Sequence, residues 1–270
     1  MSENLLNAVA PDGTSFDLIG STTGAPVVCL IHGLGLSREL WEDYLPELSK
    51  RYRVLNYDLF GHGNSSPPPQ TASLTVYSNQ LARLLDHLKI TKASVIGFSI
   101  GGMINRRFAM DHPDKLRDLV ILNSPHDRGL QAQEQVEARA ASVRDQGAFS
   151  TFDEALKRWF TPDHLSNGDG PIKVRAWREK VDPESYAQAA WVLANGVREL
   201  INPEDPIKAR TLVMTCEMDS GSTPKMSEDI AAEIAGADLS IVPRLQHLGL
   251  MENPEAFLTP ILEFLEGNIK

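Results

Sequence analysis

The chain has 270 residues, of which 42% are hydrophobic and 23% are charged, so it is long enough to bury a sizeable core. Its formal net charge is −10, which argues against nucleic acid as a partner, because phosphate binding requires a basic face. We expect no membrane span, since no apolar stretch is long enough, and residues 1–5 do not begin a leader peptide.

The first 126 residues alternate between β-prone and helical segments. Strands are predicted at residues 14–19, 27–31, 54–58, 93–96 and 116–123, with the first of them at an edge of the sheet. Helices are predicted at residues 41–48, 74–88 and 101–112. Continuous apolar strands are typical of a parallel sheet that is covered on both faces. This alternation therefore predicts an α/β fold with helices on both sides of a mostly parallel sheet.

Between residues 127 and 205 the pattern becomes helical throughout. We predict a helical cap, residues 127–205, inserted into a core formed by residues 1–126 and 206–270. Its helices are expected at residues 131–146, 152–160, 174–181 and 185–201. Trp159, Trp177 and Trp191 lie in this segment; they either pack the cap together or line a substrate pocket, because clefts between domains are favoured ligand sites.

The strand and helix alternation returns after residue 205. Strands are predicted at 211–216 and 239–242, helices at 224–235 and 254–265, and a loop at 243–251. Cys29 and Cys216 both lie in apolar runs, which indicates buried thiols in a reducing, cytoplasmic protein. No metal-ligand spacing such as C-x-x-C or H-E-x-x-H is present, so we expect neither metal nor cofactor.

A short motif joins the strand at 93–96 to the helix at 101–112. Residues 97–101, Gly-Phe-Ser-Ile-Gly, fit G-x-S-x-G, in which a sharp strand-to-helix turn exposes the serine hydroxyl. Glycines remove the Cβ atoms that would clash in so tight a turn. We therefore predict that Ser99 is a nucleophile.

A serine hydroxyl needs a base that takes its proton and an acid that orients the base. Four histidines follow Ser99, and we predict His247 as the base because it alone follows the last strand in a loop. His112 ends a helix and His164 lies in the cap, whereas His126 follows a strand and is expected near the substrate. The acid should follow the strand at 211–216, where we favour Asp219 and keep Glu217 as the alternative.

The reaction also needs N–H donors for a developing oxyanion. Ile100, directly after Ser99, is expected to supply one backbone N–H, and Leu34 in the loop His-Gly-Leu-Gly at 32–35 the other. His32 and His62 precede the serine in the chain, and we expect both to fix loops rather than to act as bases.

Five pieces of the chain together resemble the α/β-hydrolase fold superfamily over essentially its whole length. They are residues 32–35, 58–65 (Asp-Leu-Phe-Gly-His-Gly-Asn-Ser), 97–102, Asp219 and His247. The resemblance implies that Ser99, Asp219 and His247 act as nucleophile, acid and base in that chain order. Gln246 stands where relatives usually have glycine, and Phe60 replaces a common arginine.

The resemblance extends to two catabolic groups. Residues 158–162, Arg-Trp-Phe-Thr-Pro, are similar to 3-oxoadipate enol-lactonase, and residues 97–102 are similar to hydrolases of aromatic ring-cleavage products. Together they imply hydrolysis of a small carboxylic ester or enol-lactone that carries a carboxylate. Cleavage of a carbon–carbon bond in a diketo acid, or of an amide, remains the alternative, and a non-enzymatic receptor is disfavoured because all three reacting groups are present.

We expect a small-molecule substrate as the partner, with no nucleic acid or membrane, and leave a homodimer open. The predicted substrate pocket comprises His126, Arg158, Trp159, Trp177 and Trp191. A carboxylate on the substrate would need a cation, and the sequence does not choose among Arg106, Arg107, Arg128, Arg158, Arg175, Arg178 and Arg198.

Overall fold

A computed structural model describes residues 5–20 and 24–267 of the chain. Residues 1–4, 21–23 and 268–270 lie outside the described residues, and so does most of the segment for which no leader was expected.

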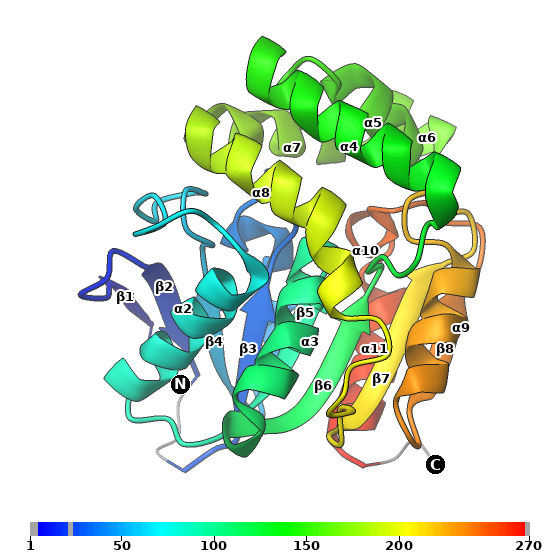
Figure 1. The fold of residues 1–270 in the computed structure, drawn as a ribbon. Helices are drawn as coiled ribbons and strands as arrows, with labels where there is room; N and C mark the ends of the chain where they lie inside the picture. Colours follow the sequence, from blue (N-terminus) through cyan, green and yellow to red (C-terminus); the bar gives the residue numbers. More distant parts are fainter. Residues whose placement is uncertain (1–4, 21–23, 268–270) are drawn as a thin grey trace.

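Eight strands form one sheet in the order β1-β2-β4-β3-β5-β6-β7-β8 (Figure 1). The strands are β1 Leu6–Val9, β2 Ser15–Ile19, β3 Val27–Ile31, β4 Arg53–Tyr57, β5 Ala93–Phe98, β6 Leu116–Leu122, β7 Arg210–Cys216 and β8 Asp238–Val242. The pairs β1–β2 and β2–β4 are antiparallel, and all other neighbours are parallel. The prediction of a mostly parallel α/β sheet is therefore confirmed.

The edge of the sheet differs from the prediction. Strand β1 lies outside β2, so residues 14–19 form the second strand rather than the edge strand. Three of the four residues of β1 are exposed, because one antiparallel hairpin partner is all that holds it. A strand with so little burial leaves no alternating apolar pattern for sequence analysis to detect.

Helices cover both faces of the sheet, as predicted. Helices α2 (Leu74–His87), α3 (Ile100–Asp111) and α9 (Pro224–Glu233) pack on one face. The short helices η1 (Arg38–Trp41) and α1 (Leu45–Leu48), with α11 (Glu255–Leu265), pack on the other. Strand β3 shows the cause: Val27, Cys29 and Ile31 point to the first cluster, and Val28 and Leu30 to the second. Both cysteines are buried free thiols.

The segment between β6 and β7 is helical and lies over the carboxyl ends of the parallel strands (Figure 1). Its elements are α4 Gly129–Gln146, α5 Phe152–Trp159, α6 Pro162–Asn167, α7 Gly170–Glu179, α8 Pro183–Asn195 and η3 Gly196–Glu199. Two further short helices, η2 Pro113–Lys115 and α10 Gly249–Glu252, lie where no helix was predicted. Sequence periodicity does not reveal helices of three to six residues such as α6, because one turn contains too few apolar positions.

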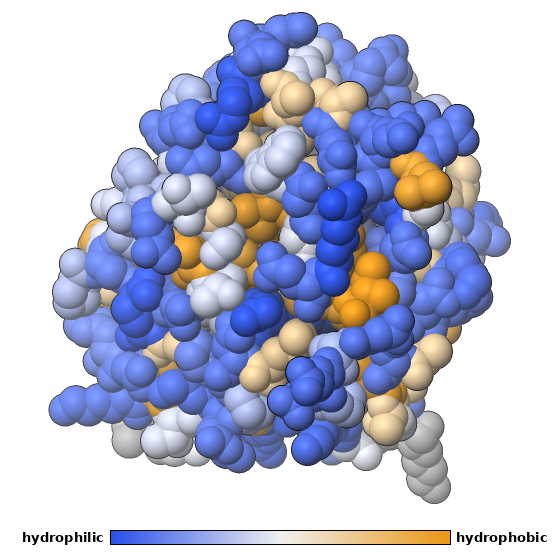
Figure 2. All heavy atoms as spheres, viewed as in Figure 1, coloured by the Kyte–Doolittle hydropathy of each residue, from blue (hydrophilic) through white to orange (hydrophobic). Residues whose placement is uncertain are grey.

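The surface agrees with the acidic, polar composition. Figure 2 shows a face that is mostly hydrophilic, on which hydrophobic residues form small separate patches. Over the described part of the chain, no helix combines the length and apolar character that a membrane crossing requires.

Candidate active site

Ser99 lies in a strained turn between β5 and α3. Its φ of 58° and ψ of −115° are uncommon for a residue with a side chain. A Cβ atom on Gly97 would lie 2.1 Å from the carbonyl oxygen of Gly101, and one on Gly101 would lie 2.5 Å from the carbonyl oxygen of Ile31. Both positions therefore require glycine, and the turn places the Ser99 hydroxyl at the carboxyl edge of the sheet.

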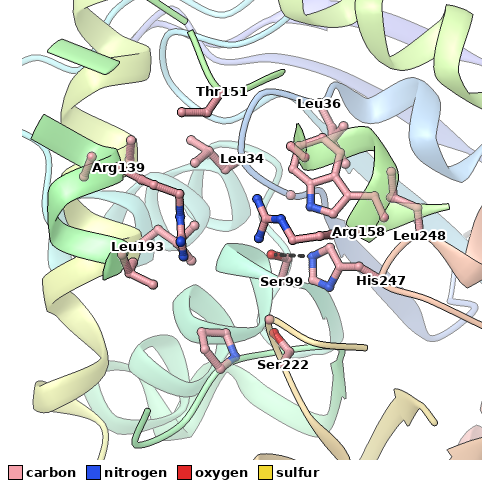
Figure 3. A pocket seen from close by; sticks show the side chains of 18 of the residues that line it. Leu34, Leu36, Ser99, Arg139, Thr151, Arg158, Leu193, Ser222, His247 and Leu248 are labelled. Atoms are coloured by element: carbon pink, nitrogen blue, oxygen red, sulfur yellow. Dashed lines mark hydrogen bonds between the residues drawn. The ribbon is translucent and has the colours of Figure 1, made fainter. Parts of the chain in front are cut away.

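The loops after β7 and β8 bring Asp219 and His247 to this serine. His247 Nε2 lies 3.2 Å from Ser99 Oγ (Figure 3), and His247 Nδ1 lies 2.6 Å from Asp219 Oδ2. These distances make one continuous line of hydrogen bonds through the imidazole ring. Glu217, the alternative acid, points elsewhere: its carboxylate accepts a hydrogen bond from the backbone N–H of Arg244.

Asp219 is a buried carboxylate with a full set of donors. Besides His247, it accepts hydrogen bonds from Asn123 Nδ2 and from the backbone N–H groups of Gly221 and Ser222, each at 2.9 Å. Burial alone would raise its pKa, but the charge and hydrogen bonds of these neighbours outweigh burial and lower the pKa below its ordinary value. Asp219 is therefore ionised beside His247. Asn123 was not predicted as a site residue; it directly follows β6 and has a φ of 46°.

Two backbone N–H groups close to Ser99 in the chain or on the pocket wall are candidates to bind an oxyanion. Ile100 is the first residue of α3, and the first N–H groups of a helix have no acceptor within the helix. Leu34 lies on the pocket wall in the loop after β3 (Figure 3). Neither N–H donates to another group within the residues that the structure describes, so both are available to an oxyanion.

His32 and His62 stand behind this loop. Both are fully buried, and burial lowers the pKa of His32 to about 4 and that of His62 to about 3. His32 Nε2 accepts the backbone N–H of Leu59, which ties the loop after β3 to the loop after β4. Two neutral, buried rings of this kind fix loops, and neither contacts Ser99.

A pocket opens above Ser99 and His247 between the sheet and helices α4, α5 and α8. Of the five residues predicted to line it, Trp159 and Arg158 do so, and Figure 3 shows Arg158 in the pocket. The Trp159 ring lies 6.3 Å from the His247 ring, centre to centre. The pocket wall also includes Arg139, which the sequence analysis did not name. Val136, Arg139, Ala140 and Val143 all line the pocket from α4, at the spacing of one helix face.

The structure does not bring the other three predicted residues to the pocket. His126 lies beside it and bonds instead to the Glu233 carboxylate of α9 at 3.0 Å. Trp177 is buried in the core, where its Nε1 donates to Glu39 at 2.6 Å. Trp191 is half exposed on the outer side of α8. Helical periodicity places a tryptophan on a helix but does not say which way the docked helix turns it.

Gln246 joins the His247 loop to helix α5. Its side-chain Nε2 donates to the carbonyl oxygens of Lys157 and Arg158 at 3.1 and 3.2 Å. On the other side of His247, the backbone N–H of Leu248 donates to the Trp159 carbonyl at 2.8 Å. These carbonyls belong to the last turn of α5, where carbonyl oxygens have no N–H donor from within the helix. The unusual glutamine thus holds the helix end that carries Arg158.

We expect Gln246→Glu to lower the free energy of unfolding by about 1 kcal/mol, because the carboxylate has the same shape but cannot donate to the two carbonyls. Denaturant unfolding followed by circular dichroism measures the change. Gln131→Glu, on an exposed part of α4, is the control and should leave stability within about 0.5 kcal/mol of the wild type. Equal stability of Gln246→Glu and the wild type would contradict this assignment.

A strained serine between a parallel strand and a helix, bonded to a histidine and a buried carboxylate from later strand ends, defines an α/β hydrolase. Comparison with known families agrees: the model of the alpha/beta hydrolase fold matches residues 26–254, so the chain belongs to this family and is an enzyme.

Among curated relatives, (E)-2-((N-methylformamido)methylene)succinate hydrolase of Acinetobacter baylyi is 26% identical, with 90% of this chain and 91% of the relative covered. The 3-oxoadipate enol-lactonase 2 of the same organism is 28% identical, with 86% and 85% covered. A solved enol-lactonase from Burkholderia xenovorans LB400 superposes with a TM-score of 0.86 at 28% identity, covering 94% of this chain and 98% of that one. The resemblance to α/β hydrolases and to 3-oxoadipate enol-lactonase, predicted from the sequence, is thus confirmed.

Proposed function

We propose that this chain is a serine hydrolase of small carboxylic esters or enol-lactones that carry a carboxylate. The observation that carries the proposal is the line of hydrogen bonds from Asp219 through His247 to Ser99 at the floor of a pocket. This arrangement supplies a nucleophile, a base and an orienting acid within bonding reach of one another.

In the first half of the reaction, Ser99 Oγ attacks the acyl carbon while His247 Nε2 takes the hydroxyl proton. Asp219 accepts from Nδ1, holds the ring in the tautomer that leaves Nε2 free, and stabilises the imidazolium. The N–H groups of Leu34 and Ile100 bind the oxyanion. The intermediate collapses to an acyl-enzyme, and His247 gives its proton to the leaving oxygen.

In the second half, His247 takes a proton from water, and the hydroxide attacks the acyl carbon of the ester on Ser99. The bond to Ser99 Oγ breaks, the proton returns to Oγ, and a carboxylic acid leaves. For a lactone, the leaving oxygen stays joined to the acyl carbon through the carbon chain, so a single hydroxy or keto acid leaves in this step. Every group in the cycle comes from the chain, the substrate or water.

The choice of substrate rests on two supports. One relative is named for an enol-lactone and another for a succinate derivative, and both names describe compounds related to carboxylic acids. The pocket of this chain presents arginine side chains next to Ser99, which would bind a carboxylate.

A substrate panel tests the proposal. We expect the wild type to hydrolyse p-nitrophenyl esters and enol-lactones, and the products to be the free acid and the alcohol or keto acid, measured by absorbance and mass spectrometry. A vinylogous diketo acid in the same panel tests the alternative chemistry. Carbon–carbon cleavage of that compound without turnover of any ester or lactone would overturn the proposal.

A further inference from the structure

The pocket above Ser99 is cationic, although the chain as a whole has a net charge of −10. Four arginines line it: Arg128, Arg139, Arg158 and Arg178. Among the described residues of its wall, Asp219 is the single carboxylate, and that carboxylate is bonded to His247. The pocket wall therefore carries more positive than negative charge.

Two of the four arginines donate hydrogen bonds to carbonyl or hydroxyl oxygens of other elements around the pocket. Arg128 donates from Nη2 to the Leu193 carbonyl at 3.0 Å and reaches the Ala194 carbonyl from Nη1. Arg178 is buried and donates to the Ala148 carbonyl at 3.0 Å and to the Tyr186 hydroxyl. Both side chains thus join elements around the pocket.

The other two, Arg139 and Arg158, are free to bind a ligand. Within residues 5–20 and 24–267, the Arg139 guanidinium has neither a hydrogen bond nor an ion pair, and the Arg158 guanidinium donates only to the Glu154 carbonyl of its own helix at 3.3 Å. Figure 3 shows Arg139 reaching in from α4 and Arg158 from α5, with both guanidinium groups directed into the cavity near Ser99. Burial and then the positive charge of Arg158 lower the pKa of Arg139, so the two cations repel each other.

We propose that Arg139 and Arg158 each bind one carboxylate, so that the substrate hydrolysed at Ser99 carries two carboxylates besides its ester or lactone. A substrate with one carboxylate would neutralise one guanidinium and leave the other unpaired, whereas a dianion satisfies both. Each guanidinium can hold a carboxylate through two parallel hydrogen bonds. Val136, Leu193 and Leu34 on the same wall would contact the carbon skeleton between the charges. This inference rests on the proposed function.

Three p-nitrophenyl esters of rising charge test it: the pentanoate, the glutarate monoester and the tricarballylate monoester, with zero, one and two free carboxylates. We expect kcat/KM to rise about tenfold with each charge, as a charge-assisted hydrogen bond of about 1.4 kcal/mol requires. Arg139→Met and Arg158→Met should each lower kcat/KM for the doubly charged ester about tenfold and change the neutral ester less than about twofold.

Arg144→Met is the matched control, because Arg144 lies on the same helix, is exposed and pairs with Glu184 at 3.4 Å. It should keep the wild-type preference among the three esters. Equal kcat/KM for the singly and doubly charged esters would overturn the two-carboxylate assignment, and so would equal losses on the neutral and charged esters in the Arg139 and Arg158 variants.

Calorimetry with glutarate and pentanoate provides a readout that needs no turnover. Tighter binding of glutarate to the wild type, lost in both arginine variants, supports the two anion sites even if no ester is hydrolysed, in which case the proposed function alone fails. Conversely, turnover of the neutral ester that depends on Ser99, together with equal binding of the two acids, leaves the proposed function standing and overturns the inference.

Discussion

Replacing Ser99 by alanine should lower kcat for an ester substrate by about 10⁵-fold or more, because no other group can form the acyl-enzyme. The loss should fall on kcat rather than on KM, since the pocket wall keeps its shape. Alanine retains the Cβ atom at the strained φ and removes only the hydroxyl that bonds to His247, so the variant should stay folded. Stopped-flow or steady-state release of p-nitrophenol measures the change.

Labelling with a fluorophosphonate gives a second measurement on the same variant. The wild type should take one label at Ser99, found by mass spectrometry of the digested protein, and Ser99→Ala should take none. Ser220→Ala is the control, because Ser220 is a second hydroxyl on the pocket wall. Undiminished labelling of Ser99→Ala would show that another serine is the nucleophile.

Replacing Asp219 by asparagine should lower kcat by about 10⁴-fold. An asparagine side chain can donate a hydrogen bond to His247 Nδ1, which favours the tautomer that carries its proton on Nε2, and that nitrogen then cannot accept the Ser99 proton. Glu217→Gln, in the same loop, should keep kcat within about twofold, because the Glu217 carboxylate bonds to Arg244 rather than to His247. A larger loss in Glu217→Gln than in Asp219→Asn would transfer the role of the acid.

Asp219→Asn should also change how the free energy of unfolding depends on pH in acid. The pKa of Asp219 is lower in the folded state than in the unfolded state, so its ionisation stabilises the fold fully above the unfolded pKa and loses this effect as the pH falls through the folded pKa. We therefore expect the free energy of unfolding of Asp219→Asn to depend less on pH below about pH 4. Denaturant titrations at several pH values provide the measurement.

The sheet, its covering helices and the line from Ser99 to Asp219 were accessible from sequence because each leaves a local signal. Strand β3 is a continuous apolar run, and the turn at Ser99 needs glycines at fixed positions. Asp219 and His247 could be chosen because residues that follow parallel strands meet at one edge of the sheet. Strand β1 left no such signal, since it is exposed and four residues long.

The pocket wall was harder to predict because it depends on how helices dock. Trp177 and Trp191 lie on helices as expected, yet one turns into the core and the other toward solvent. Arg139 was missed, although a signal existed: it interrupts the apolar stripe of Val136, Ala140 and Val143 on α4. A charged residue within an apolar helix face is a place to look for a ligand contact.

Because of the hydrogen bonds of Gln246 and Leu248, substitutions around Arg158 and around Arg139 should have different consequences during evolution. Arg158 lies at the end of α5, whose carbonyls accept hydrogen bonds from Gln246 and Leu248, the residues on either side of His247. A shift of the α5 backbone would therefore move His247 as well. Arg139 stands on α4, which packs against α8 and has no such tie to the His247 loop within the described chain. Substrate preference can therefore diversify through α4 with little effect on turnover, whereas changes that shift the backbone at the end of α5 alter selectivity and chemistry together.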